Sequence, residues 1–220
     1  MKNMRFTFIP FMMQRRIMIL AMMLMASVAT SHFSYAQAVD ATPDGLVKFM
    51  VNDIMSSIRS DKEIMSGNIN KVIALVDTKI VPYTDFGRTT QLAMGKNWSK
   101  ATPEQQKLIV TEFKTLLIRT YAGALTQVKD QKIIFKPFRM DPADLEAVVR
   151  TSVIDKGDPV QLDYRLQKVG DGWKFYDLNV LGAWLIEAYR GQFNNQINAS
   201  GIDGLIKFLQ DRNIALAKAK

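Results

Sequence analysis

The chain of 220 residues contains no cysteine and one histidine, His32. The absence of cysteine excludes disulfides, thiolate metal sites, thiol catalysis and a lipoprotein anchor on a modified N-terminal cysteine. His32 precedes an expected export cleavage site, so we expect the exported protein to carry neither a thiol nor an imidazole. Such a protein binds its ligand without reacting, or it reacts through carboxylate, serine, lysine or tyrosine side chains.

Residues 1–36 have the three parts of a secretory signal peptide. The apolar core covers 17–29, and Ser-Tyr-Ala at 34–36 is a small-x-Ala cleavage site. The basic leader that precedes them carries Lys2, Arg5, Arg15 and Arg16. We expect cleavage after Ala36 and a soluble, monomeric protein in a bacterial periplasm. An uncleaved membrane anchor is the alternative, for which the apolar core is short compared with a span of about 20 residues.

The remaining residues, 37–220, have a suitable length for one domain with its own core. The leader accounts for half of the formal net charge of +8, so the exported protein is only mildly basic. Nucleic-acid binding needs exposed aromatic residues among basic ones, whereas the aromatics of this chain fall mostly on apolar faces. We therefore expect no nucleic-acid partner.

The first half of the exported chain shows helical patterns. Thr42 is a candidate N-cap followed by Pro43, and apolar residues then recur at helical spacing. Further helices are expected near 69–76 and 85–94. The clearest helix begins with Thr102-Pro-Glu-Gln105, a capping-box pattern, and continues with one apolar face.

After residue 130 the apolar period changes from helical spacing to two. Strands are expected at 133–138, 147–154, 160–167 and 173–180, and the short turns between them favour an antiparallel meander. Helices return over 183–198 and again from 203, with Gly201 between them. The order predicts an α+β fold, with a twisted antiparallel sheet of about four strands packed against a helical layer.

Carboxylates are the main candidates for chemistry in this sequence. Asp141 and Asp144 flank a proline as a turn does, so we expect no metal site and no cofactor. Asp163 lies on the polar side of its strand pattern and is expected to be solvated. Asp177 shares an expected strand face with Trp173 and Phe175, which predicts a buried carboxylate that accepts backbone hydrogen bonds or pairs with an arginine.

Large apolar residues are unusually frequent at positions predicted to lie between the sheet and the helices. A close-packed core is the simpler interpretation of this pattern. The alternative is a wall around an apolar pocket, and the residues alone leave both open.

The ordered motifs of the exported chain resemble those of the MlaC, or toluene-tolerance auxiliary, family. The first half carries Phe86, Leu92-Ala-Met-Gly95-x-x-Trp98, Pro103-Glu-Gln105 and Phe113-x-x-Leu-Leu117-x-x-Thr-Tyr121. The second half carries Tyr164-Arg165, Gly172-Trp-Lys-x-Tyr-Asp177, Tyr189-Arg-x-x-Phe193 and Gly201-x-Asp-Gly-Leu205. Many members have Glu-Gly-Val-Ser where this chain has Leu-Gly-Ala-Trp at 181–184, so Trp184 replaces the usual serine.

The resemblance implies a periplasmic carrier of glycerophospholipids and not an enzyme. It would shuttle its cargo between an outer-membrane lipoprotein–porin complex and an inner-membrane ABC transporter with a lipid-binding ring, and so maintain outer-membrane lipid asymmetry. The family's acyl chains lie between the sheet and the helices.

Strand alternation and helix faces then predict the site residues. We expect eight side chains to contact the tails: Phe113, Leu117, Tyr121, Val149, Val153, Leu162, Tyr164 and Trp184. Arg165 or Arg190 is expected to meet the headgroup near the pocket mouth, although each is an equally good partner for Asp177. A binding protein that delivers a small apolar solute to an importer is the main alternative, and a hydrolase without histidine is a more distant one.

Overall fold

The computed structural model describes residues 42–128, 131–155 and 157–218. The expected signal peptide, its cleavage after Ala36 and His32 lie outside these residues. The chain divides into two units, Met1–Ala38 and Val39–Lys220, and everything below concerns the second. Within the described segments, no helix combines the length and apolar character needed to cross a membrane.

Helices form the first half of the described chain, as the sequence predicts. In order they are α2 (Pro43–Ser60), α3 (Lys62–Met65), α4 (Ile69–Lys79), the 3-10 helix η1 (Val81–Tyr83), α5 (Phe86–Met94), the 3-10 helix η2 (Gly95–Lys100) and α6 (Pro103–Leu125). The Thr42 hydroxyl accepts a hydrogen bond from the Gly45 N–H and caps α2. Both hydrogen bonds of the capping box at Thr102 and Gln105 are present, at 2.9 and 3.2 Å, so this predicted helix start is confirmed.

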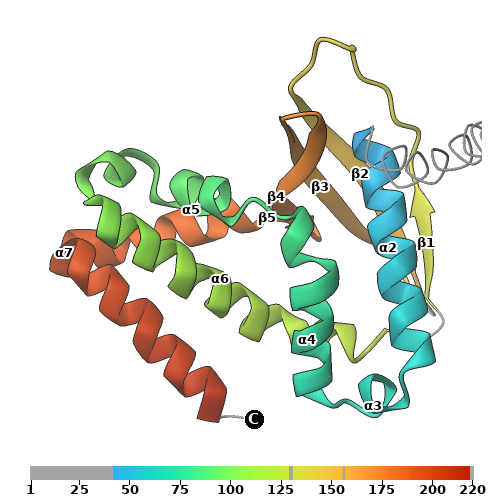
Figure 1. Ribbon diagram of the computed structural model, residues 1–220, viewed down its shortest axis with the longest axis horizontal. Coiled ribbons are helices and arrows are strands. Elements are labelled where there is room, and N and C mark those ends of the chain that lie inside the picture. Colours follow the sequence, from blue (N-terminus) through green and yellow to red (C-terminus); the bar gives the residue numbers. More distant parts are fainter. Residues whose placement is uncertain (1–41, 129–130, 156, 219–220) are drawn as a thin grey trace, which may run out of the picture. The chain divides into compact units, whose positions relative to one another are not determined.

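Five antiparallel strands follow in the order β1-β2-β3-β4-β5, and the predicted α+β fold is confirmed (Figure 1). They are β1 (Lys132–Phe135), β2 (Glu146–Ile154), β3 (Val160–Val169), β4 (Gly172–Val180) and β5 (Ala183–Trp184). Strand β1 ends before Pro137, three residues earlier than the predicted limit at 138, since a proline has no N–H to donate to the ladder.

The fifth strand was not predicted, because residues 183 and 184 were expected to begin a helix. A turn at Leu181 and Gly182, both with positive φ, folds Ala183 and Trp184 back onto β4. Helix α7 (Leu185–Lys218) starts directly afterwards. It is interrupted by the non-helical Ser200 and Gly201, as the sequence predicts for Gly201.

The buried apolar side chains of the described residues form three separate clusters. The helix cluster joins α5, η2, α6 and α7 around Phe113 and Phe193. The sheet cluster joins α2 to β2, β3 and β4, and a smaller cluster joins α2, α3, α4 and α6 around Ile58 and Val72. In Figure 1, α2 lies along the sheet, while α5, α6 and α7 pack with one another. A domain of this size usually has one continuous core, so the division needs an explanation.

Candidate functional site

Five of the eight predicted tail-contacting residues fall into two of these clusters. Phe113 and Leu117 belong to the helix cluster, where the Phe113 ring lies 4.8 Å from the rings of both Tyr189 and Phe193. Phe113 is fully buried by these rings, whereas Leu117, one turn further along α6, is only partly buried. We expected the α6 residues and the strand residues to line one common interior. In the structure each group packs in its own cluster.

The strand residues of the prediction lie in or beside the sheet cluster. Val149 on β2 and Tyr164 on β3 are register partners, and both are buried against α2. Leu162 is partly buried at the margin of this cluster. Val153 is also partly buried and pairs with Val160 near the end of β2. The partly buried side chains offer apolar surface that is not covered by other residues in this state.

Tyr121 lies on α6 with 40% of its surface exposed. Burial raises the pKa of the neighbouring Tyr189 hydroxyl, and the proximity of Tyr121 raises it further. Both effects keep Tyr189 a neutral phenol at physiological pH. The Tyr189 hydroxyl thus gives the helix cluster an uncharged polar group beside Tyr121.

Trp184 lies on the other face of the sheet from Val149 and Tyr164. Its ring stacks on the Arg165 guanidinium, with 3.7 Å from the guanidinium carbon to the ring centroid. Successive side chains of a strand point to opposite faces, so Arg165 points away from the α2 side when Tyr164 packs there. Trp184 is a short-range cation–π partner of Arg165 in this structure.

Asp177 is the partner of Arg165 and has a fully buried side chain. Its carboxylate accepts hydrogen bonds from the N–H groups of Leu178 and Ile186 and from Arg165 at 3.0 Å. Burial raises the pKa of Asp177, while these donors act to lower it. The predicted buried carboxylate with backbone donors and an arginine is therefore confirmed, and its contact with Ile186 fixes the start of α7.

The predicted strand face of Asp177 was wrong. The register shifts between Arg165 and Leu166, so that Arg165 pairs with Asp177 while Leu166 pairs with Phe175. The extra residue on β4 is Tyr176, and this bulge places Asp177 on the opposite face from Phe175. A bulge reverses the alternation that the sequence pattern assumes.

The expectation that Asp163 is solvated was also wrong. The residue is buried, with only 2% of its surface exposed. One carboxylate oxygen accepts a hydrogen bond from the Gln161 side chain at 2.5 Å, and the other has no partner among the described residues. The alternation correctly placed Asp163 away from the α2 side of the sheet. It did not reveal that this face is itself covered, since Asn179, its register partner on β4, is buried too.

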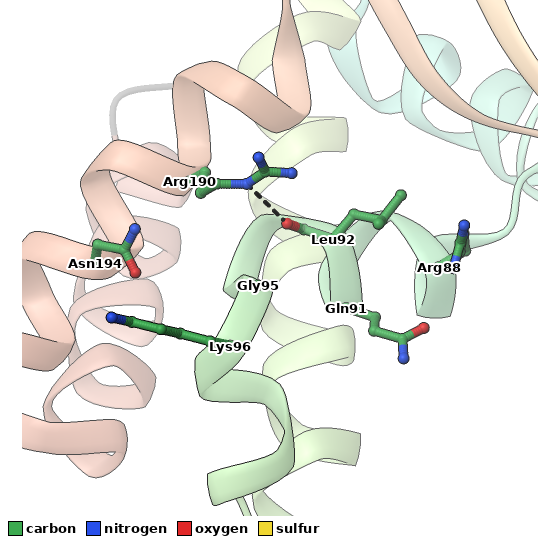
Figure 2. A pocket seen from close by; sticks show the side chains of 7 residues that line it. All are labelled: Arg88, Gln91, Leu92, Gly95, Lys96, Arg190 and Asn194. Carbon is green, nitrogen blue, oxygen red and sulfur yellow. Dashed lines mark hydrogen bonds between the residues drawn. The ribbon is translucent and has the colours of Figure 1, made fainter.

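The two predicted headgroup residues have different surroundings. Arg165 is neutralised by Asp177 and lies 3.8 Å from Glu187 as well. Arg190 instead lines a polar pocket of about 570 Å³ between α5, η2 and α7 (Figure 2). The other residues of this pocket are Arg88, Gln91, Leu92, Gly95, Lys96 and Asn194.

The sequence did not single out Arg88 and Lys96, which share the pocket with Arg190. They are about a hundred residues away from Arg190 along the chain, and isolated basic residues give no local pattern. Elsewhere, the part of the chain that the structure describes contains no group of three or more histidine, cysteine or acidic residues placed to hold a metal ion.

Comparison with known proteins identifies relatives over most of the chain. The model of the MlaC protein family matches residues 48–211. Toluene tolerance protein Ttg2D of Pseudomonas putida is 26% identical over 180 residues, covering 81% of this chain and 83% of that protein. The intermembrane phospholipid transport system binding protein MlaC of Haemophilus influenzae is 22% identical over 175 residues, covering 78% and 82% of the two chains.

A solved structure shows the same fold. The phospholipid-binding protein of Ralstonia solanacearum, determined in complex with a phospholipid, is 51% identical to this chain with a TM-score of 0.76. The match covers 81% of this chain and 99% of that protein. Together with the family match, this similarity shows that the chain belongs to the MlaC family.

Proposed function

We propose that this protein is a periplasmic carrier that binds a glycerophospholipid and moves it between the outer and inner membranes, without a catalytic step. The observation that carries the proposal is the divided apolar interior. Partly buried apolar side chains border each cluster, among them Leu117 and Leu185 beside the helix cluster and Leu162 and Leu178 beside the sheet cluster. Acyl chains inserted between sheet and helices would cover these margins.

The energetics of the cargo require such a site to be deep. Two acyl chains contain roughly 30 methylene groups, and exposing each one to water costs about 0.8 kcal/mol, or on the order of 24 kcal/mol in total. A shallow surface groove covers too little of the tails to offset this cost. The sheet and the helix cluster must therefore enclose most of both tails, while the charged headgroup stays in water at the rim.

The site residues of the proposal follow from their burial. Leu117, Leu162 and Val153 are partly buried and are proposed to contact the tails directly. The fully buried members of the predicted set, Phe113, Val149 and Tyr164, would form the wall behind them. Tyr121 and Trp184 are proposed to lie at the rim, where their polar edges reach water.

Transfer between membranes requires partners, because the cost of exposing the tails would otherwise trap the cargo. We propose an outer-membrane lipoprotein–porin complex and an inner-membrane ABC transporter with a lipid-binding ring. The support for this is the family membership and the name of the Haemophilus influenzae relative, which assigns that protein to an intermembrane phospholipid transport system.

Native mass spectrometry of the protein purified without detergent tests the proposal. We expect a fraction of the protein to carry the added mass of one glycerophospholipid, and the emptied protein to reload from liposomes. An empty protein that also takes up no lipid from liposomes contradicts the proposal. Displacement of a bound fluorescent fatty acid by small apolar solutes, but not by phospholipids, would instead support the importer alternative.

A further inference from the structure

The polar pocket between α5, η2 and α7 has the chemistry of an anion site. Three of its seven lining residues are basic, namely Arg88, Lys96 and Arg190, and two more, Gln91 and Asn194, carry amide groups. None of the seven is acidic. A volume of about 570 Å³ falls within the range typical of small-molecule sites.

Two of the three basic residues have free donors. The Nε of Arg190 donates to the Leu92 carbonyl at 3.1 Å, which holds the guanidinium in place as Figure 2 shows. Its two terminal amino groups have no partner among the described residues. The Lys96 ammonium likewise makes no hydrogen bond or ion pair with any residue that the structure describes, and it extends toward Asn194 in Figure 2.

Arg88 is held more firmly than the other two. Its guanidinium pairs with Glu146 at 3.2 Å and lies over the Tyr176 ring, 5.8 Å from the centroid. Glu146 lies on β2 and is not part of the pocket lining. Arg88 therefore has a fixed position at one side of the pocket, with its charge paired to Glu146.

A structural role for Arg190 explains only part of this arrangement. Leu92 lies in the last turn of α5, where carbonyl groups lack helical partners and attract cations. This accounts for the Nε contact. It does not involve the two terminal amino groups of this exposed side chain, which are available to a ligand, or the basic residues Lys96 and Arg88 that line the same pocket.

We propose that this pocket binds a phosphate group. Its oxygens accept several charge-assisted hydrogen bonds at once, and the planar guanidinium of Arg190 matches them as a two-donor fork. The phosphate group can come from the headgroup of the cargo lipid, or from free phosphate or a small phosphate ester. The lipid source rests on the proposed carrier function, whereas the phosphate chemistry does not.

Titration of the delipidated protein with inorganic phosphate and with glycerol 3-phosphate tests the site. Amide chemical shifts of Gly95 and Lys96 are expected to change in a saturable, salt-sensitive manner. Arg190→Gln and Lys96→Gln are each expected to weaken binding about tenfold. Arg139→Gln and Lys107→Gln, which remove exposed charges outside the pocket, are matched controls and should leave the affinity unchanged.

Lipid loading distinguishes the two sources. If the lipid headgroup occupies the pocket, Arg190→Gln lowers phospholipid uptake from phosphatidylglycerol vesicles but not the binding of a fluorescent fatty acid. If only free phosphate binds, the variant loses phosphate affinity and loads lipid normally. Variants that change neither measurement overturn the phosphate site. The carrier function is then decided separately by native mass spectrometry. A protein that binds phosphate but never loads lipid retains the site and loses the carrier function.

Discussion

The helix cluster and the sheet cluster bury similar kinds of side chains but enclose them to different degrees. Among the described residues, the helix cluster has eleven buried members and seven partly buried ones. The sheet cluster has eight of each. Phe113, Tyr189 and Phe193 contact one another edge to face in the helix cluster, whereas the sheet cluster ends in partly covered side chains such as Phe175 and Leu178.

This difference indicates that the two clusters have different roles. The helix cluster is closed by its own aromatic rings, and so it supplies stability independently of any ligand. The sheet cluster is covered on its apolar face mainly by α2, and its margins leave partly exposed apolar surface, which the proposed function assigns to the acyl chains. The contrast makes the two regions respond differently to mutation.

Charge insertion on α6 gives the largest expected effects. Ile109 is fully buried in the helix cluster, so Ile109→Asp places an unpaired carboxylate in the core and is expected to cost about 5 kcal/mol or more, enough to prevent folding. Leu117→Asp, on the same helix, is expected to cost only about 1–2 kcal/mol because this residue is partly exposed. It should nevertheless lower lipid occupancy about tenfold, as measured by native mass spectrometry.

Val153→Asp provides the same measurement from the sheet side and should also lower lipid occupancy more than stability. Urea unfolding of all three variants separates the two quantities. Equal destabilisation by Leu117→Asp and Ile109→Asp would show that α6 has no ligand-facing position. In that case only the sheet cluster would be left to contact the acyl chains, and Leu117 would be removed from the proposed site.

Truncation of one aromatic ring in each cluster compares how much the two clusters contribute to stability. Phe193→Ala removes a fully buried ring that contacts Phe113 and Tyr189, and we expect a loss of about 3–5 kcal/mol in unfolding free energy. Phe175→Ala removes a partly buried ring of the sheet cluster and is expected to cost less than half as much. Urea denaturation of the lipid-free protein measures both. A larger loss for Phe175→Ala would contradict the assignment of stability to the helix cluster.

The sequence predicts the helix starts and the strand order well because these depend on local chemistry. The Thr102–Gln105 capping box needs only four consecutive residues, and the alternation over 160–167 needs only one strand. Both patterns act over a few residues and are visible without tertiary contacts.

The candidate site is harder to predict because its geometry depends on contacts between distant residues. The bulge at Tyr176 moves Asp177 to the opposite face of the sheet from Phe175, and no sequence pattern in β4 predicts the bulge. The positive φ of Leu181 is unusual for a residue with a branched side chain, and it permits β5 where a helix was expected. Arg88, Lys96 and Arg190 form one pocket only after α5 and α7 have packed together.

Trp184→Ser tests the sheet face that lies away from α2. The substitution restores the residue that the family resemblance places here, and it removes the ring from the Arg165 guanidinium. We expect a loss of about 1–2 kcal/mol in unfolding free energy, since a cation–π contact and partly buried apolar surface disappear. Arg165→Lys keeps the charge but not the planar stack and should cost about as much. If Trp184→Ser leaves the unfolding free energy unchanged, the stack contributes nothing to stability.

The smallest expected effects are opposite pH slopes from two carboxylates, Asp177 on β4 and Asp44 in the first turn of α2. Burial raises the pKa of Asp177, with hydrogen bonds from Ile186, Leu178 and Arg165 opposing it. Burial also acts to raise the pKa of Asp44 at the start of α2, but hydrogen bonds from Lys48 and Thr42 outweigh it and lower that pKa. Folding therefore shifts the pKa values of the two carboxyl groups in opposite directions.

A raised folded-state pKa means that the native protein binds the proton more tightly than the unfolded chain does. The contribution of Asp177 to stability is therefore present below the ordinary carboxyl pKa, and it is lost as pH rises through the folded-state pKa. The contribution of Asp44 is present above the ordinary range and is lost as pH falls through its lowered pKa. Relative to the unmodified protein, Asp177→Asn should gain stability as pH rises from the acid side toward neutrality, and Asp44→Asn should lose it. Urea unfolding across this pH interval measures the slopes, which remain readable even if each substitution adds a constant offset. Slopes of the same sign would contradict the opposite pKa shifts of Asp177 and Asp44 on folding.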